Sequence, residues 1–197
     1  MTEEELQKLN EAFQYPFYTK AGAKLVCFLT CLYDTPQEID PDEVFYNGAG
    51  GFISVTDEEM DYLAANGYNM PANWREYTFP DGTINIWPVF LKTSTIDDIL
   101  MKRLGITLSE VELELGSKYH MEWVPEFDAY YTRGRGDTNV WNVLFQTGVY
   151  IGDDTYVVDY CPEMWIGILG EGTYRVTFTM TNNDPDTIMF ISNVKLG

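Results

Sequence analysis

The sequence has few basic residues for its length. Its 197 residues include 12 Lys and Arg against 31 Asp and Glu, which gives a formal net charge of −19 at pH 7 with the single His neutral. Binding to duplex nucleic acid or to anionic lipid needs clustered Lys and Arg, and the longest basic cluster here is Lys102–Arg103. We therefore expect no direct nucleic-acid binding and no attachment to an anionic membrane surface.

Long apolar runs are also missing. A bilayer span needs about 20 apolar residues, and the longest run here, from Leu25 to Leu32, is interrupted by Thr30. Residues 1–5 show neither the basic nor the apolar segment of a signal peptide. We therefore expect no membrane insertion and a cytoplasmic location for the sequence as written, or an extracellular or cell-surface location if a leader precedes it.

Cysteine and histidine are scarce. The three cysteines are Cys27, Cys31 and Cys161, an odd and low number that argues against a disulfide framework. A zinc site needs three or four nitrogen or sulfur ligands, and any histidine-based nucleophilic site would depend on His120, which we place in a strand between aromatic residues. We therefore predict no catalytic residue, no metal site and no cofactor, with Cys27 and Cys31 buried as small apolar side chains.

What the sequence does contain predicts a folded protein. Hydrophobic residues make up 45% and aromatics 15%, and a chain of this size buries roughly 70% of its unfolded surface. No repeat or linker divides the chain, so we predict one domain over residues 1–197.

Helical signals dominate residues 1–117. Capping boxes, in which Glu follows Thr by three residues, begin at Thr2 and Thr56, and Asp40 is an N-cap followed by Pro at the first helical position. The predicted helices cover residues 2–13, residues 19–32, a short stretch after Asp40, the stretch from Asp57 to Gly67, and the stretch from Ser94 or Thr95 to Gly105. Between the last two, residues 77–87 suggest a hairpin around Pro80–Gly82.

From about Lys118 the apolar period changes to two. The predicted strands lie within residues 140–151, 155–160, 174–180 and 187–194, with turn residues between them. Helices first and strands later indicate an α+β fold, in which the N-terminal helices (residues 1–117) pack on a C-terminal antiparallel β-sheet, a meander, formed by residues 118–197. Polar residues alternate with apolar ones along residues 174–180, so one face of the sheet should be wet.

An uncompensated acidic stretch is the main electrostatic feature. Residues 25–74 contain no Lys or Arg and nine acids, which are Asp34, Glu38, Asp40, Asp42, Glu43, Asp57, Glu58, Glu59 and Asp61. Acids in first turns stabilise a helix by ~0.3–1 kcal/mol each, so helix capping and solubility are one interpretation. The second is an acidic interaction face that binds a basic partner or imitates nucleic acid, and the third is cation binding.

Aromatic and loop residues supply further candidates. A possible aromatic binding face for a protein or a glycan consists of Tyr130, Tyr131, Trp141 and Trp165. Asp184 and Asp186 lie in a loop with the oxygen-rich side chains that calcium prefers, although turn formation also explains them. A hydrolase would need two carboxylates about 5–9.5 Å apart, and the sequence selects no such pair.

Several short stretches carry a resemblance to a known domain. They are residues 28–40, 99–106, 127–131, 136–138 and 190–194. Together they make the chain resemble an uncharacterised domain of gut Firmicutes proteins, which often stands behind lipoprotein signals. The resemblance implies a bacterial source of gut type or its mobile element and a non-catalytic role, and it assigns no functional residue.

We therefore predict a non-enzymatic binding domain that uses the acidic helical face and the aromatic β face. Its partner would be a protein, most readily a basic one, or a glycan. The first alternative is an acidic nucleic-acid mimic that inhibits a nucleic-acid enzyme, and the second is a carboxylate-based hydrolase.

Overall fold

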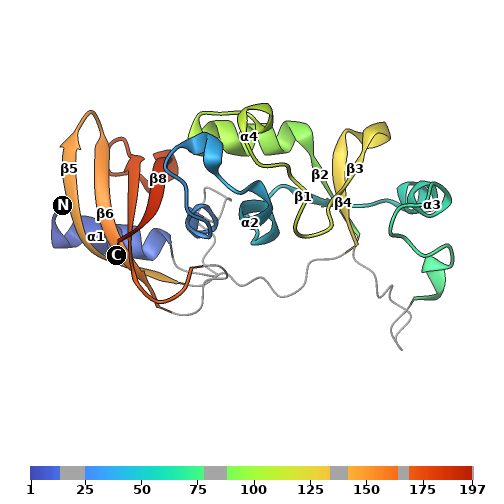
Figure 1. The fold of residues 1–197 in the computed structure, drawn as a ribbon, viewed down its shortest axis with the longest axis horizontal. Coiled ribbons are helices and arrows are strands. Elements are labelled where there is room, and N and C mark those ends of the chain that lie inside the picture. Colours follow the sequence, from blue (N-terminus) through green and yellow to red (C-terminus); the bar gives the residue numbers. More distant parts are fainter. Residues whose placement is uncertain (14–24, 78–87, 134–141, 164–168, 197) are drawn as a thin grey trace.

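The computed structural model describes residues 1–13, 25–77, 88–133, 142–163 and 169–196. This part of the chain forms α-helices and two four-stranded antiparallel sheets, which is the predicted α+β fold (Figure 1). The α-helices are α1 (Glu3–Ala12), α2 (Pro41–Tyr46), α3 (Asp57–Ala65) and α4 (Thr93–Leu104). The strands are β1 (Phe52–Ser54), β2 (Val89–Lys92), β3 (Glu122–Val124), β4 (Ala129–Thr132), β5 (Val143–Gly152), β6 (Thr155–Pro162), β7 (Thr173–Thr179) and β8 (Met189–Leu196). Short 3-10 turns are η1 (Leu25–Leu29), η2 (Pro36–Glu38), η3 (Trp74–Glu76), η4 (Leu108–Glu110), η5 (Pro125–Phe127) and η6 (Pro185–Thr187).

The predicted meander is the C-terminal sheet. Its strand order is β5-β6-β7-β8, and every neighbouring pair is antiparallel. Along β7, Val176 and Phe178 are buried whereas Arg175 is exposed, so the predicted wet face is confirmed. The sheet stands at one end of the molecule in Figure 1.

A second sheet was not expected. Its order is β1-β2-β4-β3, and β1 and β2 come from the part of the chain that the sequence predicts to be helical. Its strands are three or four residues long, too short for a period of two to stand out. Neighbouring residues of β2 point to opposite faces, and both Phe90 and Leu91 are fully buried, so this sheet is covered on both sides.

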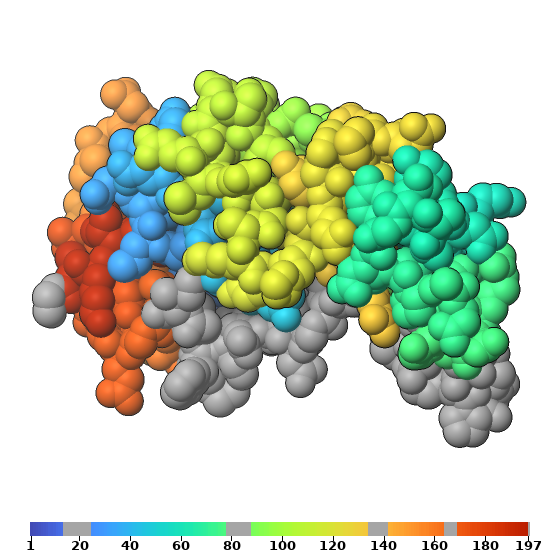
Figure 2. Space-filling view, turned by 45° about the vertical axis from the view of Figure 1, so that its right-hand side comes forward, coloured from blue at the N-terminus to red at the C-terminus, as the bar shows by residue number. Residues whose placement is uncertain are grey.

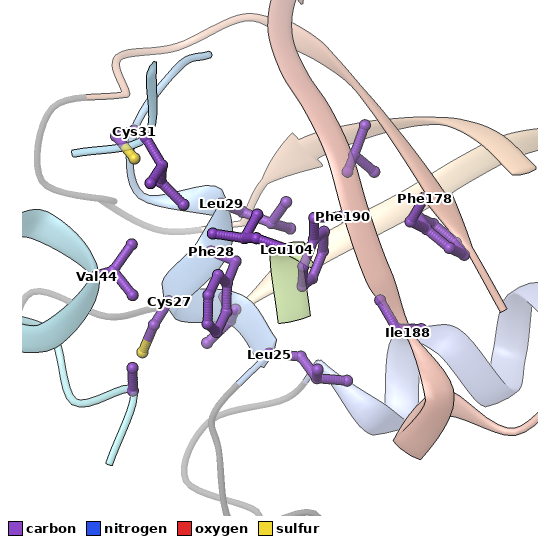
Figure 3. Close-up of a cluster of buried hydrophobic side chains, with 14 of the residues drawn as sticks. Leu25, Cys27, Phe28, Leu29, Cys31, Val44, Leu104, Phe178, Ile188 and Phe190 are labelled. Carbon is purple, nitrogen blue, oxygen red and sulfur yellow. The ribbon is translucent and has the colours of Figure 1, made fainter. Parts of the chain in front are cut away.

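The larger hydrophobic cluster lies between the meander and the segments that cover it. Phe28 stacks on Phe190 with ring centroids 5.3 Å apart, and Phe13 of the chain after α1 meets Phe145 edge-on at 4.9 Å. Leu104 of α4 packs in the same cluster (Figure 3). This cluster joins helices and meander in the way that the sequence predicts.

The smaller cluster covers the other face of the second sheet. Leu63 of α3 and Trp74 are buried there against Phe90 and Tyr131. As a result α3 lies at the end of the molecule opposite the meander, with the second sheet between them (Figure 1).

The capping signals predicted the helix starts. Thr2 and Thr56 form complete capping boxes at α1 and α3, and the Asp40 side chain caps α2. The last predicted helix is α4, which ends at Leu104 and is capped by Gly105. The hairpin predicted over residues 77–87 falls outside the described residues except for Tyr77.

Two local predictions are wrong. In the described part of the predicted 19–32 helix, only the 3-10 turn η1 forms, and Leu32 is exposed instead of lining an apolar stripe. Every residue of η1 is apolar and buried, so no side of it faces solvent as one side of an amphipathic helix would. A few residues further on, Tyr33 forms an antiparallel bridge with Asn193 of β8. His120 is not in a strand: it is exposed, with a φ of 53°, just before β3. Cys27 and Cys31 are buried, as predicted.

Candidate functional site

Three of the nine acids do not belong to any exposed face. Asp40, Asp42 and Glu43, at the start of α2, are 8%, 0% and 2% exposed. Their burial corrects the expectation that all nine contribute free charge at the surface. Buried carboxylates persist only when they are hydrogen-bonded or paired, and the partners of these three come from residues 116–119.

Asp42 holds this segment through its backbone. Its carboxylate accepts hydrogen bonds from the Gly116 N–H at 2.7 Å, the Ser117 hydroxyl at 3.1 Å and the Lys118 N–H at 2.7 Å. Three donors on one buried carboxylate fix the segment against the start of α2.

The neighbouring acids hold the next two side chains. The Lys118 ammonium contacts both Asp40 and Glu43, and the Tyr119 hydroxyl donates to Glu43 at 2.6 Å. Burial lowers the pKa of Lys118, but its hydrogen bond to Asp40 and the two carboxylate charges outweigh this, so the pKa is raised. Burial and the hydrogen bond to Glu43 also raise the pKa of Tyr119. The cluster is therefore an internal clamp whose charges are already partnered.

The remaining acids lie in separate places. Asp34 lies just before η2 and Glu38 is its last residue, whereas Asp57, Glu58, Glu59 and Asp61 lie on α3, at the end of the molecule away from the meander. Asp61 accepts from Arg75 at 2.5 and 2.8 Å and from Trp74 Nε1 at 3.0 Å, which lowers its pKa. These positions form two acidic areas and not one continuous strip.

A cleft opens beside the clamp. It has a volume of about 390 Å³ and is formed by the 114–121 segment, β3, β4 and the start of α4. Its lining residues are Thr93, Glu114, Leu115, Gly116, Ser117, Met121, Trp123 and Tyr130. Figure 2 shows the yellow-green 105–120 segment next to the yellow residues 120–133 on this side of the molecule. Gly116 and Ser117 are shared with the clamp, so Asp42 positions one wall of the cleft.

Two aromatic rings also line the cleft. Trp123 of β3 and Tyr130 of β4 are register partners, with ring centroids 5.1 Å apart. Trp123 is 42% exposed, which is unusual for a large aromatic side chain. Burial raises the pKa of Tyr130, and the nearby charges of Glu114 and Asp42 raise it further. The cleft thus combines ring faces with a negative potential.

The predicted aromatic face is only partly present. Tyr130 lines the cleft, but Tyr131 is 1% exposed and donates its hydroxyl to the Asn69 carbonyl at 3.1 Å. Trp141 and Trp165 lie outside the described residues. Trp123 was missed, although its place between Glu122 and Val124 has the alternation of a half-buried strand.

The calcium candidates have a local role. Asp184 caps η6 and accepts from the Asp186 N–H at 3.0 Å. In the part of the chain that the structure describes, no three His, Cys, Asp or Glu side chains come together as a metal site. Among the described residues that line the cleft, Glu114 is the single carboxylate, so the pair needed for a hydrolase is not found there.

Comparisons with known proteins give no identity. No protein-family model, curated protein or solved structure matches this chain. The resemblance to the gut Firmicutes domain therefore stays a prediction. Among the described helices, none has both the length and the apolar character needed to cross a membrane.

Proposed function

We propose that the protein is a non-enzymatic binding module whose cleft takes a cationic side chain of a basic protein partner. The observation that carries this proposal is the exposed Trp123 ring beside the half-buried Tyr130, in a cleft that Glu114 also lines, in a chain of net charge −19. This retains the predicted basic partner and moves its contact from a broad acidic face to one cleft.

The cleft chemistry suits a guanidinium or ammonium group. A cation within about 6 Å of an aromatic ring face gains about 0.5–2 kcal/mol, depending on how far it is desolvated. Glu114 lies on the same cleft and supplies a counter-charge, and Ser117 and Thr93 supply hydroxyl groups. A cation in the cleft is therefore attracted by the aromatic rings and by the Glu114 carboxylate.

The charge of the whole chain supports the same ligand. An excess of carboxylates raises the local concentration of cationic partners and accelerates their association. The exposed acids Asp57 and Glu58 of α3 add to this field without lining the cleft. Long-range attraction and the local contacts in the cleft thus both favour a positively charged ligand.

Isothermal titration with a blocked hexa-arginine peptide tests the proposal. We expect Trp123→Ala to weaken binding about tenfold because the cation loses its main ring face, while Trp123→Phe retains most of the affinity. Glu114→Gln should weaken binding about threefold, and higher salt should weaken it for every variant.

The matched control is Tyr150→Ala, which removes an aromatic side chain that is 52% exposed on β5, in the meander and away from the cleft. Unchanged affinity in this variant is expected. Equal affinity of wild type and Trp123→Ala would contradict the cleft, because the peptide would then bind the general charge. Binding of maltohexaose in place of the peptide would contradict the basic partner and favour a glycan.

The two other predicted functions have less support. A nucleic-acid mimic needs carboxylates spaced along a strip, whereas the exposed acids among the nine of the predicted acidic face lie in two separate areas. A hydrolase needs a second carboxylate in the cleft. No observation on the described residues favours either function over cation binding.

A further inference from the structure

The outer face of the meander exposes apolar side chains. Val149 and Ile151 of β5 are 60% and 62% exposed, and Leu144 and Met189 are 41% and 38% exposed. Val149 pairs with Val157 of β6, and the next residue, Val158, is fully buried. Because neighbouring strand residues point to opposite faces, Val149 and Val157 lie on the outer face. These residues form an open surface at the end of the molecule away from α3 (Figure 1).

This surface is almost uncharged. The four strands contain three charged residues, which are Asp159, Arg175 and Lys195. Asp159 and Arg175 pair on the outer face at 2.7 and 3.0 Å, and Lys195 lies over the ring of the buried Tyr174. The charges of the strand residues on the outer face therefore sum to zero in a chain whose total is −19.

We propose that this face binds a second copy of the chain, sheet against sheet, about a two-fold axis. A basic partner gains no charge attraction from a neutral surface, whereas a second copy presents a surface that is equally apolar and neutral. A two-fold axis that passes between Asp159 and Arg175 would also place Asp159 of one copy over Arg175 of the other, so that the pairs of both copies complement each other.

The area of the face sets the strength of the contact. Four strands spaced about 4.8 Å apart, each about eight residues long, cover roughly 500 Å². Two copies would bury about 1,000 Å² in total, at the low end of specific interfaces. We therefore expect a weak dimer with a dissociation constant in the micromolar range or above.

Salt separates this contact from the cleft. Two copies of charge −19 repel each other until ions screen them, so raising the salt should strengthen dimerisation. The same change should weaken binding of the hexa-arginine peptide. The two proposals rest on different parts of the molecule, the second sheet for the cleft and the meander for the dimer, so either can fail without the other.

Sedimentation equilibrium of the full chain tests the dimer. At about 0.5 M NaCl, where screening is strong, the weight-average mass should rise with concentration from 22.6 kDa towards twice that value. At about 0.05 M NaCl the rise should be smaller. Val149→Asp places charge in the face and should leave the protein monomeric at both salt concentrations.

The control variant is Ile53→Asp on β1, where the side chain is 46% exposed but lies outside the meander. It should dimerise like the wild type, and circular dichroism should show that both variants are folded. A wild type that stays monomeric up to about 1 mM would overturn the proposal, since a dimer of this area should be populated by then. A dimer that Val149→Asp leaves intact, or one that salt weakens, would also overturn it.

Discussion

At the scale of single residues, Gly116 occupies the most constrained position of the cleft. Its φ of +95° lies in the left-handed region, its N–H donates to Asp42, and a Cβ atom there would overlap the Met121 carbonyl oxygen. A glycine is therefore required by conformation and by space. The clamp and the cleft both depend on this one backbone site.

We expect Gly116→Ala to lower the free energy of unfolding by about 3 kcal/mol, because left-handed strain and overpacking add. Gly67→Ala is the matched control: its φ is +81°, but a Cβ there meets nothing within 4 Å. It should cost about 1 kcal/mol. Urea denaturation measures both, and equal losses would show that the clash with Met121 does not exist.

The sequence predicted the cap at Asp40 but not what the neighbouring acids do. A cap depends on the residues that directly follow it, so Asp40, Pro41 and Asp42 announce the start of α2. The burial of Asp42 depends on Gly116, which is 74 positions away. Local sequence patterns extend over a few residues only and cannot show which distant residues meet. The clamp and the cleft wall could therefore not be predicted.

At the scale of elements, α1 protects the open edge of the meander. The Asn10 side chain accepts from the Phe145 N–H at 2.8 Å and donates to the Phe145 carbonyl at 3.3 Å. These are backbone groups of the edge strand β5, which carries no charged residue along its length. An uncharged edge strand of this length is prone to pair with other chains, and α1 covers part of it.

We expect Asn10→Ala to lower the free energy of unfolding by about 1–2 kcal/mol, because two backbone groups of Phe145 lose their partner. The variant should also aggregate more readily on gentle heating, as followed by light scattering. Asn66→Ala removes an amide that donates to Tyr62 at the exposed end of α3 and is the control. If both variants aggregate alike, α1 does not protect the β5 edge.

Local signals predicted the elements well where they are strong. The capping boxes gave the starts of α1 and α3, and the long strands of the meander carried enough alternation to be recognised. The short strands β1 to β4 gave no such signal because non-local pairing decides them. Residues 25–32 were predicted as helix because an apolar run alone cannot distinguish a helix from a buried turn.

At the scale of the whole molecule, burial predicts how stability responds to alkali. Burial raises the pKa of Cys31 from an ordinary value of 9.0 to about 12. The folded thiol thus keeps its proton where the unfolded thiol loses it. The contribution to stability is complete below pH 9 and is lost as the pH rises towards about 12.

We therefore expect the free energy of unfolding to fall by about 1 kcal/mol between pH 9 and pH 10, and by about 1.4 kcal/mol per pH unit from there to about pH 11, for this one thiol. In Cys31→Ala the free energy of unfolding should fall less steeply with pH, by that amount. Urea titrations at several pH values measure this pH dependence. An unchanged slope in Cys31→Ala would show that the Cys31 thiol does not cause it.

The overall layout followed from the sequence more closely than the site did. Composition and the change of period predicted an α+β chain with a C-terminal meander, because each depends on many residues at once. The cleft depends on Trp123 and Tyr130 facing a segment that the Asp42 clamp positions. A few long-range contacts of this kind leave little trace in residue statistics.

The strand β2 has a consequence for both ends of the molecule. Its adjacent residues Phe90 and Leu91 are buried in different hydrophobic clusters, one beneath α3 and one beneath the meander. A slip of this strand by a single position would exchange the two sets of side chains. The alignment of four residues therefore decides how both interiors are filled, and neither interior can be redesigned as though the other were absent.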